Sequence, residues 1–357
     1  MQVAQDATFR WPLPWWRSGP VALRWLLGLV ASLPLAWAAL AIAYGPLPLP
    51  GRGWLALAFA AFAGWALWGA RSRWPMGVVV LLFAALLAAW SQVRPRHDRQ
   101  WRPEVAVTPR IAIDGDRVLV SGDRNFGYPG RGGFDGRWER GELRLSEVQG
   151  VDFFVSYWEP DGAIAHTFLS FDVAGAGPLA ISIEIRPERG ESFHPLRGLL
   201  RNFELVYVVG DERDIVRVRS NHRGEEVFLY RTTASAGTAR ALFRVYASRI
   251  NALADVPEFY NVLSNNCTVN IVRYANQVGR LGRWDIRHLL NGWSDRYLYD
   301  AGLVDTSMPF AELRRRSLVN PAARAADQDP AFARVIREGR PVPATGTGAG
   351  PAAGGVR

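Results

Sequence analysis

Hydrophobic and polar positions divide this chain into two parts. Residues 21–92 are almost wholly apolar, whereas most of the charged residues follow residue 93. Three apolar runs, at about 21–44, 54–70 and 76–93, are each long enough to cross the hydrocarbon core of a bilayer. Two further runs after the first argue against a cleaved signal peptide. The pattern predicts a three-helix transmembrane anchor, preceded by a short interfacial segment, residues 1–20, in which arginines accompany tryptophans.

The distribution of arginines around these runs predicts the orientation of the chain. Arginines before the first run and in residues 71–75 favour a cytoplasmic N-terminus, and the cluster at 94–102 favours the reverse. The first helix carries more weight in orientation, so we expect residues 94–357 to lie outside the cytoplasm.

From residue 105 the hydrophobic pattern has a period of two, which predicts strands. Residues 111–120 form a hairpin pattern around an Asp-Gly turn, and the glycine-rich residues 127–136 are interpreted as a connection. Further strands are expected at 151–158, 164–171, 179–186, 203–209, 215–219 and 227–230, and helices at 238–253, 267–278, 284–290 and 321–340. The prediction is an α+β domain with an antiparallel sheet over residues 94–340, followed by a disordered tail, residues 341–357.

Composition narrows the possible partners. The net charge is +9, but the basic residues are dispersed among acids and several flank the apolar runs. This distribution predicts membrane phospholipid, and no nucleic acid, as a partner. No metal-binding motif is present, so we expect no metal and no cofactor. The sequence carries no signal for an oligomeric state.

The single cysteine, Cys267, is the first candidate for chemistry. It follows Ser-Asn-Asn at 264–266, three residues that favour a helix N-cap, and Gly279 provides a stop signal. A cysteine in the first turn of a helix lies at the positive end of the helix dipole, which favours the nucleophilic thiolate. The alternative is a buried structural cysteine, although its polar flanks are unusual for one.

His166 is the best candidate for a base beside this thiol because it lies inside a predicted strand. If Phe171 pairs with Leu179 in a hairpin, the antiparallel register places His166 opposite Glu184. A carboxylate that orients an imidazole, which activates a thiol, is the generalised catalytic triad. A slip of two residues would make Ser182 the neighbour instead.

Four blocks of sequence resemble the Lnb N-terminal periplasmic domain family over about residues 145–280. The blocks are His166-Thr-Phe-Leu-Ser-Phe, Ile181-Ser-Ile-Glu-Ile-Arg, Leu205-Val-Tyr-Val-Val-Gly-Asp-Glu-Arg-Asp, and Phe259-Tyr-Asn with Ser264-Asn-Asn-Cys-Thr. The order of histidine strand and cysteine helix is similar to that of circularly permuted papain-like enzymes of the NlpC/P60 and lecithin–retinol acyltransferase type. The resemblance implies Cys267 as nucleophile, His166 as base and Glu184 as orienting group. Asn265, Asn266, Ser182 and Tyr260 are further candidates for substrate binding or orientation.

The resemblance also implies a reaction and a location. In Lnb proteins a fatty acyl chain moves from the diacylglyceryl group of a bacterial lipoprotein to the α-amine of its N-terminal cysteine. The expected function is therefore a cysteine acyltransferase in the bacterial inner membrane, with its C-terminal domain in the periplasm and a lipoprotein or other lipid-linked substrate. Two alternatives are an NlpC/P60-like cell-wall amidase or peptidase, and a non-catalytic membrane-anchored module that binds envelope partners.

Overall fold

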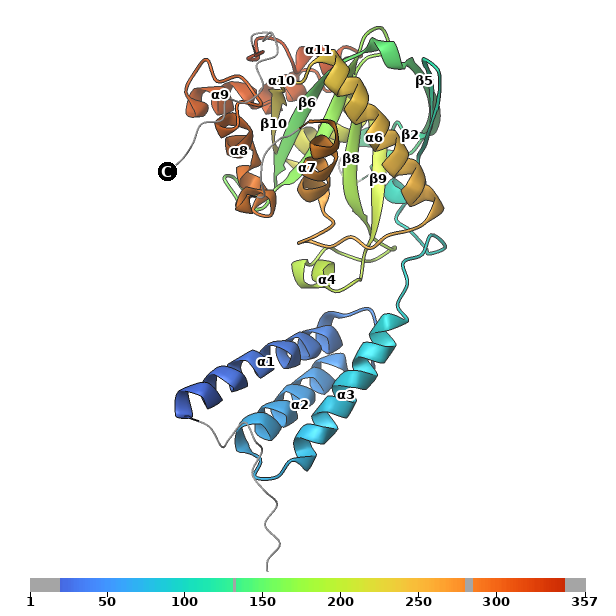
Figure 1. The fold of residues 1–357 in the computed structure, drawn as a ribbon. Helices are drawn as coiled ribbons and strands as arrows, with labels where there is room; N and C mark the ends of the chain where they lie inside the picture. Colours follow the sequence, from blue (N-terminus) through green and yellow to red (C-terminus); the bar gives the residue numbers. More distant parts are fainter. Residues whose placement is uncertain (1–19, 131–132, 280–284, 344–357) are drawn as a thin grey trace, which may run out of the picture. The chain divides into compact units, whose positions relative to one another are not determined.

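The computed structural model describes residues 20–130, 133–279 and 285–343 of the chain (Figure 1). The predicted interfacial segment and most of the predicted tail lie outside the described residues. The chain divides into two compact units. The first comprises residues 1–95 with 193–202, and the second comprises residues 96–192 with 203–357.

The first unit contains the apolar helices α1 (Val21–Tyr44), α2 (Arg52–Gly64) and α3 (Trp74–Ser91). Among the described helices, only α1 and α3 are long and apolar enough to cross a membrane. The predicted middle span is instead a 13-residue α2 followed by a five-residue π-helix, η2 (Trp65–Gly69). At 1.5 Å per residue α2 is about 20 Å long, shorter than the bilayer core of about 30 Å. The prediction of three spanning helices is thus supported for two of them.

Close packing of aromatic residues holds these helices together. The ring of Trp68 lies against Gly28, where a Cβ atom would collide with it, and it packs on Trp25 at a centroid distance of 4.8 Å. The segment 193–202, which includes the short helix α4 (Pro195–Leu199), belongs to the same unit. There the Asn202 side chain donates a hydrogen bond of 2.8 Å to the carbonyl of Tyr44. The first unit therefore consists of the N-terminal helices and the later segment 193–202.

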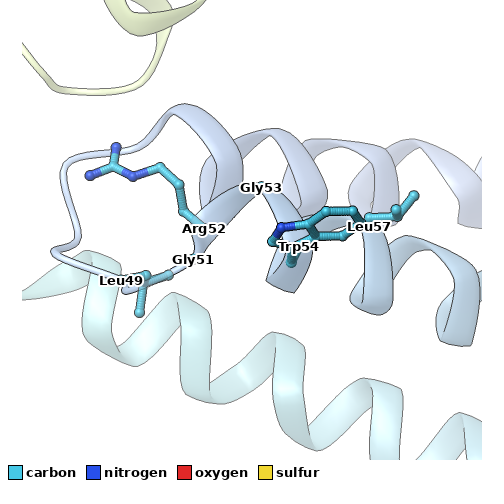
Figure 2. Close-up of a pocket in the computed structure, with 6 residues that line it drawn as sticks. All are labelled: Leu49, Gly51, Arg52, Gly53, Trp54 and Leu57. Carbon is cyan, nitrogen blue, oxygen red and sulfur yellow. The ribbon is translucent and has the colours of Figure 1, made fainter.

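A shallow hollow lies at the turn between α1 and α2 (Figure 2). It is lined by Leu49, Gly51, Arg52, Gly53, Trp54 and Leu57. The lining is largely apolar, and Arg52 is its one charged residue. The hollow belongs to the first unit and contains none of the predicted site residues.

The second unit is built on an eight-stranded sheet in the order β1-β2-β9-β8-β7-β6-β10, with β5 also paired to β2. All pairs are antiparallel except the short parallel pairing of β2 with β9. The strands are β1 (Arg110–Asp114), β2 (Arg117–Arg124), β5 (Trp138–Arg144), β6 (Val148–Tyr157), β7 (His166–Val173), β8 (Leu179–Arg186), β9 (Glu204–Asp211) and β10 (Glu226–Arg231). The mixed α and β composition and the mostly antiparallel sheet confirm the predicted fold class at this level.

Two predicted elements in the region of the sheet were wrong. The glycine-rich segment at 127–136 forms a small hairpin of β3 (Gly127–Gly130) and β4 (Gly133–Asp135). Residues 215–219 form no strand but belong to α5 (Glu212–Arg217) and the π-helix η5 (Val218–Arg223). The Asp211 side chain caps this helix by accepting from the N–H of Arg213. The consecutive apolar residues there are all buried because the helix lies on the sheet, a pattern that alternation alone cannot reveal.

Most of the remaining helices follow the last strand along the chain. Two of them, α6 (Ala236–Asp255) and α7 (Cys267–Val278), cover one face of the sheet (Figure 1). The predicted helix at 321–340 is two short helices. The other elements are η3 (Pro103–Val105), η4 (Leu145–Glu147), η6 (Ile286–His288), η7 (Asn291–Trp293), α8 (Ser294–Asp300), α9 (Phe310–Ser317), α10 (Asn320–Ala325) and α11 (Phe332–Val335).

Each face of the sheet buries its own hydrophobic core. Alternating residues such as Phe171 and Tyr207 pack against α6 and α7. Residues of the opposite alternation, such as Phe154 and Phe168, pack with α5, α10 and α11. A buried ion pair strengthens the second face, where Arg124 forms two bonds of 2.8 Å with Asp214.

The sheet divides at one end, between β7 and β8. Their pairing stops at Phe168 and Ser182. Yet β7 stays paired with β6 as far as His166, and β8 stays paired with β9 as far as Arg186. The two halves of the sheet therefore separate beyond Phe168, and backbone groups at the start of β7 are released from the β7–β8 ladder.

The sheet core should dominate the stability of the second unit. Phe171 is fully buried, with edge-to-face contacts to Phe243 and Tyr246. We expect Phe171→Ala to lower the free energy of unfolding by about 3–5 kcal/mol through lost burial and a cavity. As a control, Leu119→Ala on an exposed strand position should change it by no more than about 0.5 kcal/mol. Chemical denaturation of the two variants measures this difference, and equal effects would contradict the assigned core.

Candidate active site

Cys267 is the first residue of α7, as the cap pattern predicts. The Asn266 side chain is the N-cap and accepts a hydrogen bond of 2.8 Å from the N–H of Val269. The thiol is buried, with only 3% of the residue exposed. Cys267 therefore sits at the positive end of a capped 12-residue helix, on the sheet face that α6 and α7 cover.

His166 is the first residue of β7 and points to the other face of the sheet. Its ring stacks on Phe168 at a centroid distance of 5.9 Å, and Phe168 belongs to the second core. The intervening residue, Thr167, faces α7 and forms a hydrogen bond of 2.8 Å with Thr268. The thiol and the imidazole thus come from opposite faces and meet where β7 and β8 separate.

A chain of polar groups holds the imidazole on the side away from the thiol. His166 Nε2 lies 2.7 Å from Ser182 Oγ and 3.4 Å from Glu184 Oε1. Ser182 Oγ in turn donates to Glu184 Oε1 at 2.8 Å. Arg219 donates to the same carboxylate and anchors itself on the carbonyl of Ile215. The Nε2 atom of His166 is therefore engaged by Ser182 and Glu184.

The predicted register of the hairpin is the observed one. Phe171 pairs with Leu179, although the ladder ends two residues before His166. Both alternatives for the orienting group lie at the imidazole, where Ser182 bridges His166 and Glu184.

Electrostatics favour a charged pair despite the burial. Burial opposes ionisation of Cys267, but attraction to His166 and hydrogen bonds from His166 and Thr167 lower the thiol pKa to about 6. Burial by itself would lower the pKa of His166, but attraction to Glu184 and to the thiolate outweighs this effect, and the net result is a pKa raised to about 9. Burial would raise the pKa of Glu184, yet His166 and Arg219 hold it well below its usual value. Near neutral pH these shifts favour a thiolate paired with an imidazolium.

The remaining candidates have different surroundings. Asn265 braces the turn before α7: it donates to the carbonyl of Phe259 and accepts from Asn270, each at 2.8 Å. Asn266 serves as the helix cap. Tyr260 is half-buried, and burial together with the charges of Cys267 and Glu184 raises the pKa of its phenol. Of these three, only Tyr260 is electrostatically coupled to the reacting groups.

Sequence reasoning missed Asn291 and Arg219. Asn291 Nδ2 lies 3.6 Å from Cys267 Sγ, the same sulfur that Thr268 Oγ1 approaches at 3.8 Å. Asn291 precedes Gly292, and an Asn-Gly pair is typical of a turn. The sequence around Asn291 therefore predicts a turn and gives no indication of a role beside the thiol. Arg219 lies in the segment that alternation assigned to a strand. Its helical placement brings it to Glu184.

Within the residues that the structure describes, no group of three or more His, Cys, Asp or Glu side chains is arranged to hold a metal ion.

The fold and the site define a class: an α+β domain on a mostly antiparallel sheet that carries a buried cysteine and histidine. Residues 134–292 match the family model of the Lnb N-terminal periplasmic domain. The chain therefore contains a domain of this family, and the match includes Cys267, His166, Glu184 and Asn291. No curated protein and no solved structure shows a significant match to the chain. The family, together with the apolar α1 and α3, suggests a membrane-anchored protein with a periplasmic domain.

The ionised thiol predicts a particular pH dependence of alkylation. The rate of iodoacetamide reaction at Cys267 should rise with a midpoint near pH 6, in line with its pKa. For an unperturbed thiol, the midpoint of the alkylation rate lies at about pH 8.5. The midpoint belongs to the coupled thiol and imidazole and is measured from rate constants across pH.

Two substitutions should move this midpoint upward. His166→Ala removes the positive charge, and Glu184→Gln removes the carboxylate that keeps the imidazole protonated. His222→Ala is the control because His222 is exposed, packs on Tyr128 in a tilted arrangement, and is not among the groups that shift the thiol pKa. A midpoint that stays near pH 6 in His166→Ala would contradict the charged pair.

Proposed function

We propose that this protein is a membrane-anchored cysteine acyltransferase that acts on a bacterial lipoprotein or another lipid-linked substrate. The observation that carries the proposal is the placement of Cys267 at the capped start of α7, which a Thr167–Thr268 hydrogen bond joins to the strand that begins at His166. The imidazole is held by Ser182 and Glu184, and attraction between imidazole and thiol shifts the pKa of each toward the charged form. A structural cysteine gains nothing from ionisation, whereas a nucleophile requires it.

The side chains support a two-step reaction. The Cys267 thiolate attacks the carbonyl carbon of an ester, a C–S bond forms, and the C=O electron pair moves onto oxygen. When this intermediate collapses, the C–O bond breaks and the His166 imidazolium protonates the departing alkoxide. In the second step an amine attacks the thioester, the C–S bond breaks, and neutral His166 accepts the amine proton. The products are an amide and the regenerated thiolate.

Apolar side chains near the site support an acyl substrate. Trp158 and Ile164 flank the loop that leads into His166, and 51% and 45% of these residues are exposed. Leu263, which is 56% exposed, lies in the turn before Cys267, and Trp293, 45% exposed, follows Asn291. Exposed large apolar side chains close to a buried nucleophile favour a hydrophobic substrate over a cell-wall peptide.

We propose that α1, residues 52–69 and α3 each cross the membrane, which places the N-terminus in the cytoplasm and the sheet domain in the periplasm. An alkaline phosphatase fusion after residue 100 should then be active. Cysteines introduced at 71–75 in a Cys267→Ser background should be labelled only from the cytoplasm. If residues 52–69 did not cross, the N-terminus would share the side of the sheet domain, and an N-terminal reporter would reveal this.

The proposed reaction predicts a mass change in native lipoproteins. With this protein present, lipoprotein N-termini should show an acyl group on the α-amine, and one ester-linked acyl chain should be lost. Cys267→Ser should abolish the change because a hydroxyl is far less ionised than a thiol near neutral pH. Mass spectrometry of lipoproteins from cells with wild-type protein, the variant or neither gives the comparison. Unchanged lipoproteins with altered muropeptides would favour an amidase instead, and no change in either would favour a binding module.

A further inference from the structure

Asn291 is held against the nucleophile by bonds that fix its orientation. Its Oδ1 accepts a hydrogen bond of 2.9 Å from the backbone N–H of Ala165. Because an N–H can only donate, the oxygen of the amide must face Ala165 and the NH₂ group must face Cys267. Asn291 Nδ2 then points at the sulfur from 3.6 Å, in a residue only 5% exposed.

The backbone of η7 gives this arrangement little freedom. A Cβ on Gly292 would collide with the carbonyl oxygen of Gly162, so only glycine allows η7 to lie this close to the loop before β7. Gly292 N donates to the Ala163 carbonyl at 3.0 Å, and its own carbonyl accepts from Tyr157. Ser294 Oγ donates to the Asn291 carbonyl at 2.7 Å. The amide is thus positioned before any substrate binds.

The choice of acceptor distinguishes Asn291 from a structural asparagine. Asn320 is equally buried and uses both ends of its amide on the backbone: it accepts from Val227 N at 2.8 Å and donates to Glu225 O at 2.7 Å. Asn291 instead bonds to the backbone only through the oxygen of its amide and directs its NH₂ at the sulfur of Cys267. The donor end of Asn291 is thus placed at the candidate site, whereas both ends of the Asn320 amide brace the fold.

We propose that Asn291 Nδ2 is a catalytic donor to the oxyanion that forms when Cys267 attacks an acyl carbonyl, an inference that rests on the proposed function. In the tetrahedral intermediate the C–S bond has formed and the former carbonyl oxygen carries the electron pair of the broken π bond. This oxygen is bonded to the carbon that sulfur holds, within reach of a donor that already faces sulfur. The N–H of Cys267, which has no acceptor within the helix because Cys267 is the first residue of α7, is the second donor in this proposal.

Two reactions of the same thiol test this role. Attack on the p-nitrophenyl ester of a medium-chain fatty acid forms an oxyanion, whereas alkylation by iodoacetamide forms none. We expect Asn291→Ala in the full-length protein in detergent to slow acylation by about 10²–10³-fold, the usual effect of removing one oxyanion donor. The pH-independent rate of alkylation should stay within about twofold, because the thiolate remains the nucleophile. Asn320→Ala should leave both rates unchanged.

The other possible results lead to different conclusions about the role of Asn291. An equal loss of acylation and alkylation in Asn291→Ala would overturn the proposal, since Asn291 would then only position the thiol. Unchanged acylation would overturn it as well. Release of p-nitrophenolate that is equally fast in the wild type and in Cys267→Ser would instead overturn the cysteine mechanism itself. A fold defect would appear as a lowered Tm, and the alkylation rate then reports whether the remaining native site is intact.

Discussion

A thiolate and an imidazolium can stay charged away from water only if their surroundings replace the solvent. Burial opposes both charges in this site, at Cys267 and at His166. Their mutual attraction recovers part of the cost, and the rest comes from a second layer: Glu184 supports the imidazolium, and Arg219 keeps Glu184 ionised. The four groups alternate in sign, so the loss of any member leaves a neighbouring charge without compensation.

This alternation requires groups from both faces of the sheet. Cys267 lies with α7 on one face, and Glu184 and Arg219 lie on the other. A continuous β-ladder would place backbone hydrogen bonds between them. The separation of β7 and β8 beyond Phe168 removes that obstacle, and the N–H of Thr167 becomes available to the sulfur. The irregular end of the sheet is thus the feature that allows the site to form.

The same end of the sheet explains why the oxyanion donor comes from far along the chain. Asn291 approaches through the loop that precedes β7, where Gly292 permits close backbone contact. Asn291 and Cys267 therefore both contact the short stretch Ala165–Thr167, which contains His166. A reaction centre built around one strand terminus needs few rigid contacts to stay aligned.

The sequence by itself determined most of the elements and the principal pair. Alternation located β6 to β10, and the cap pattern located the start of α7. For β7 on β8 the sequence left two registers open, because a slip of two residues keeps the same faces, and the structure shows the one that pairs Phe171 with Leu179. The sequence could not determine the partners that depend on distance in space. The role of Arg219 was missed because the alternating pattern Ile-Val-Arg-Val-Arg at 215–219 predicts a strand, whereas these residues form a helix packed on the sheet. Asn291 was hidden because an Asn-Gly pair predicts a turn. The local sequence pattern determines on which face of a strand or helix a side chain lies. Which side chains from distant parts of the chain come into contact there is decided only by tertiary packing.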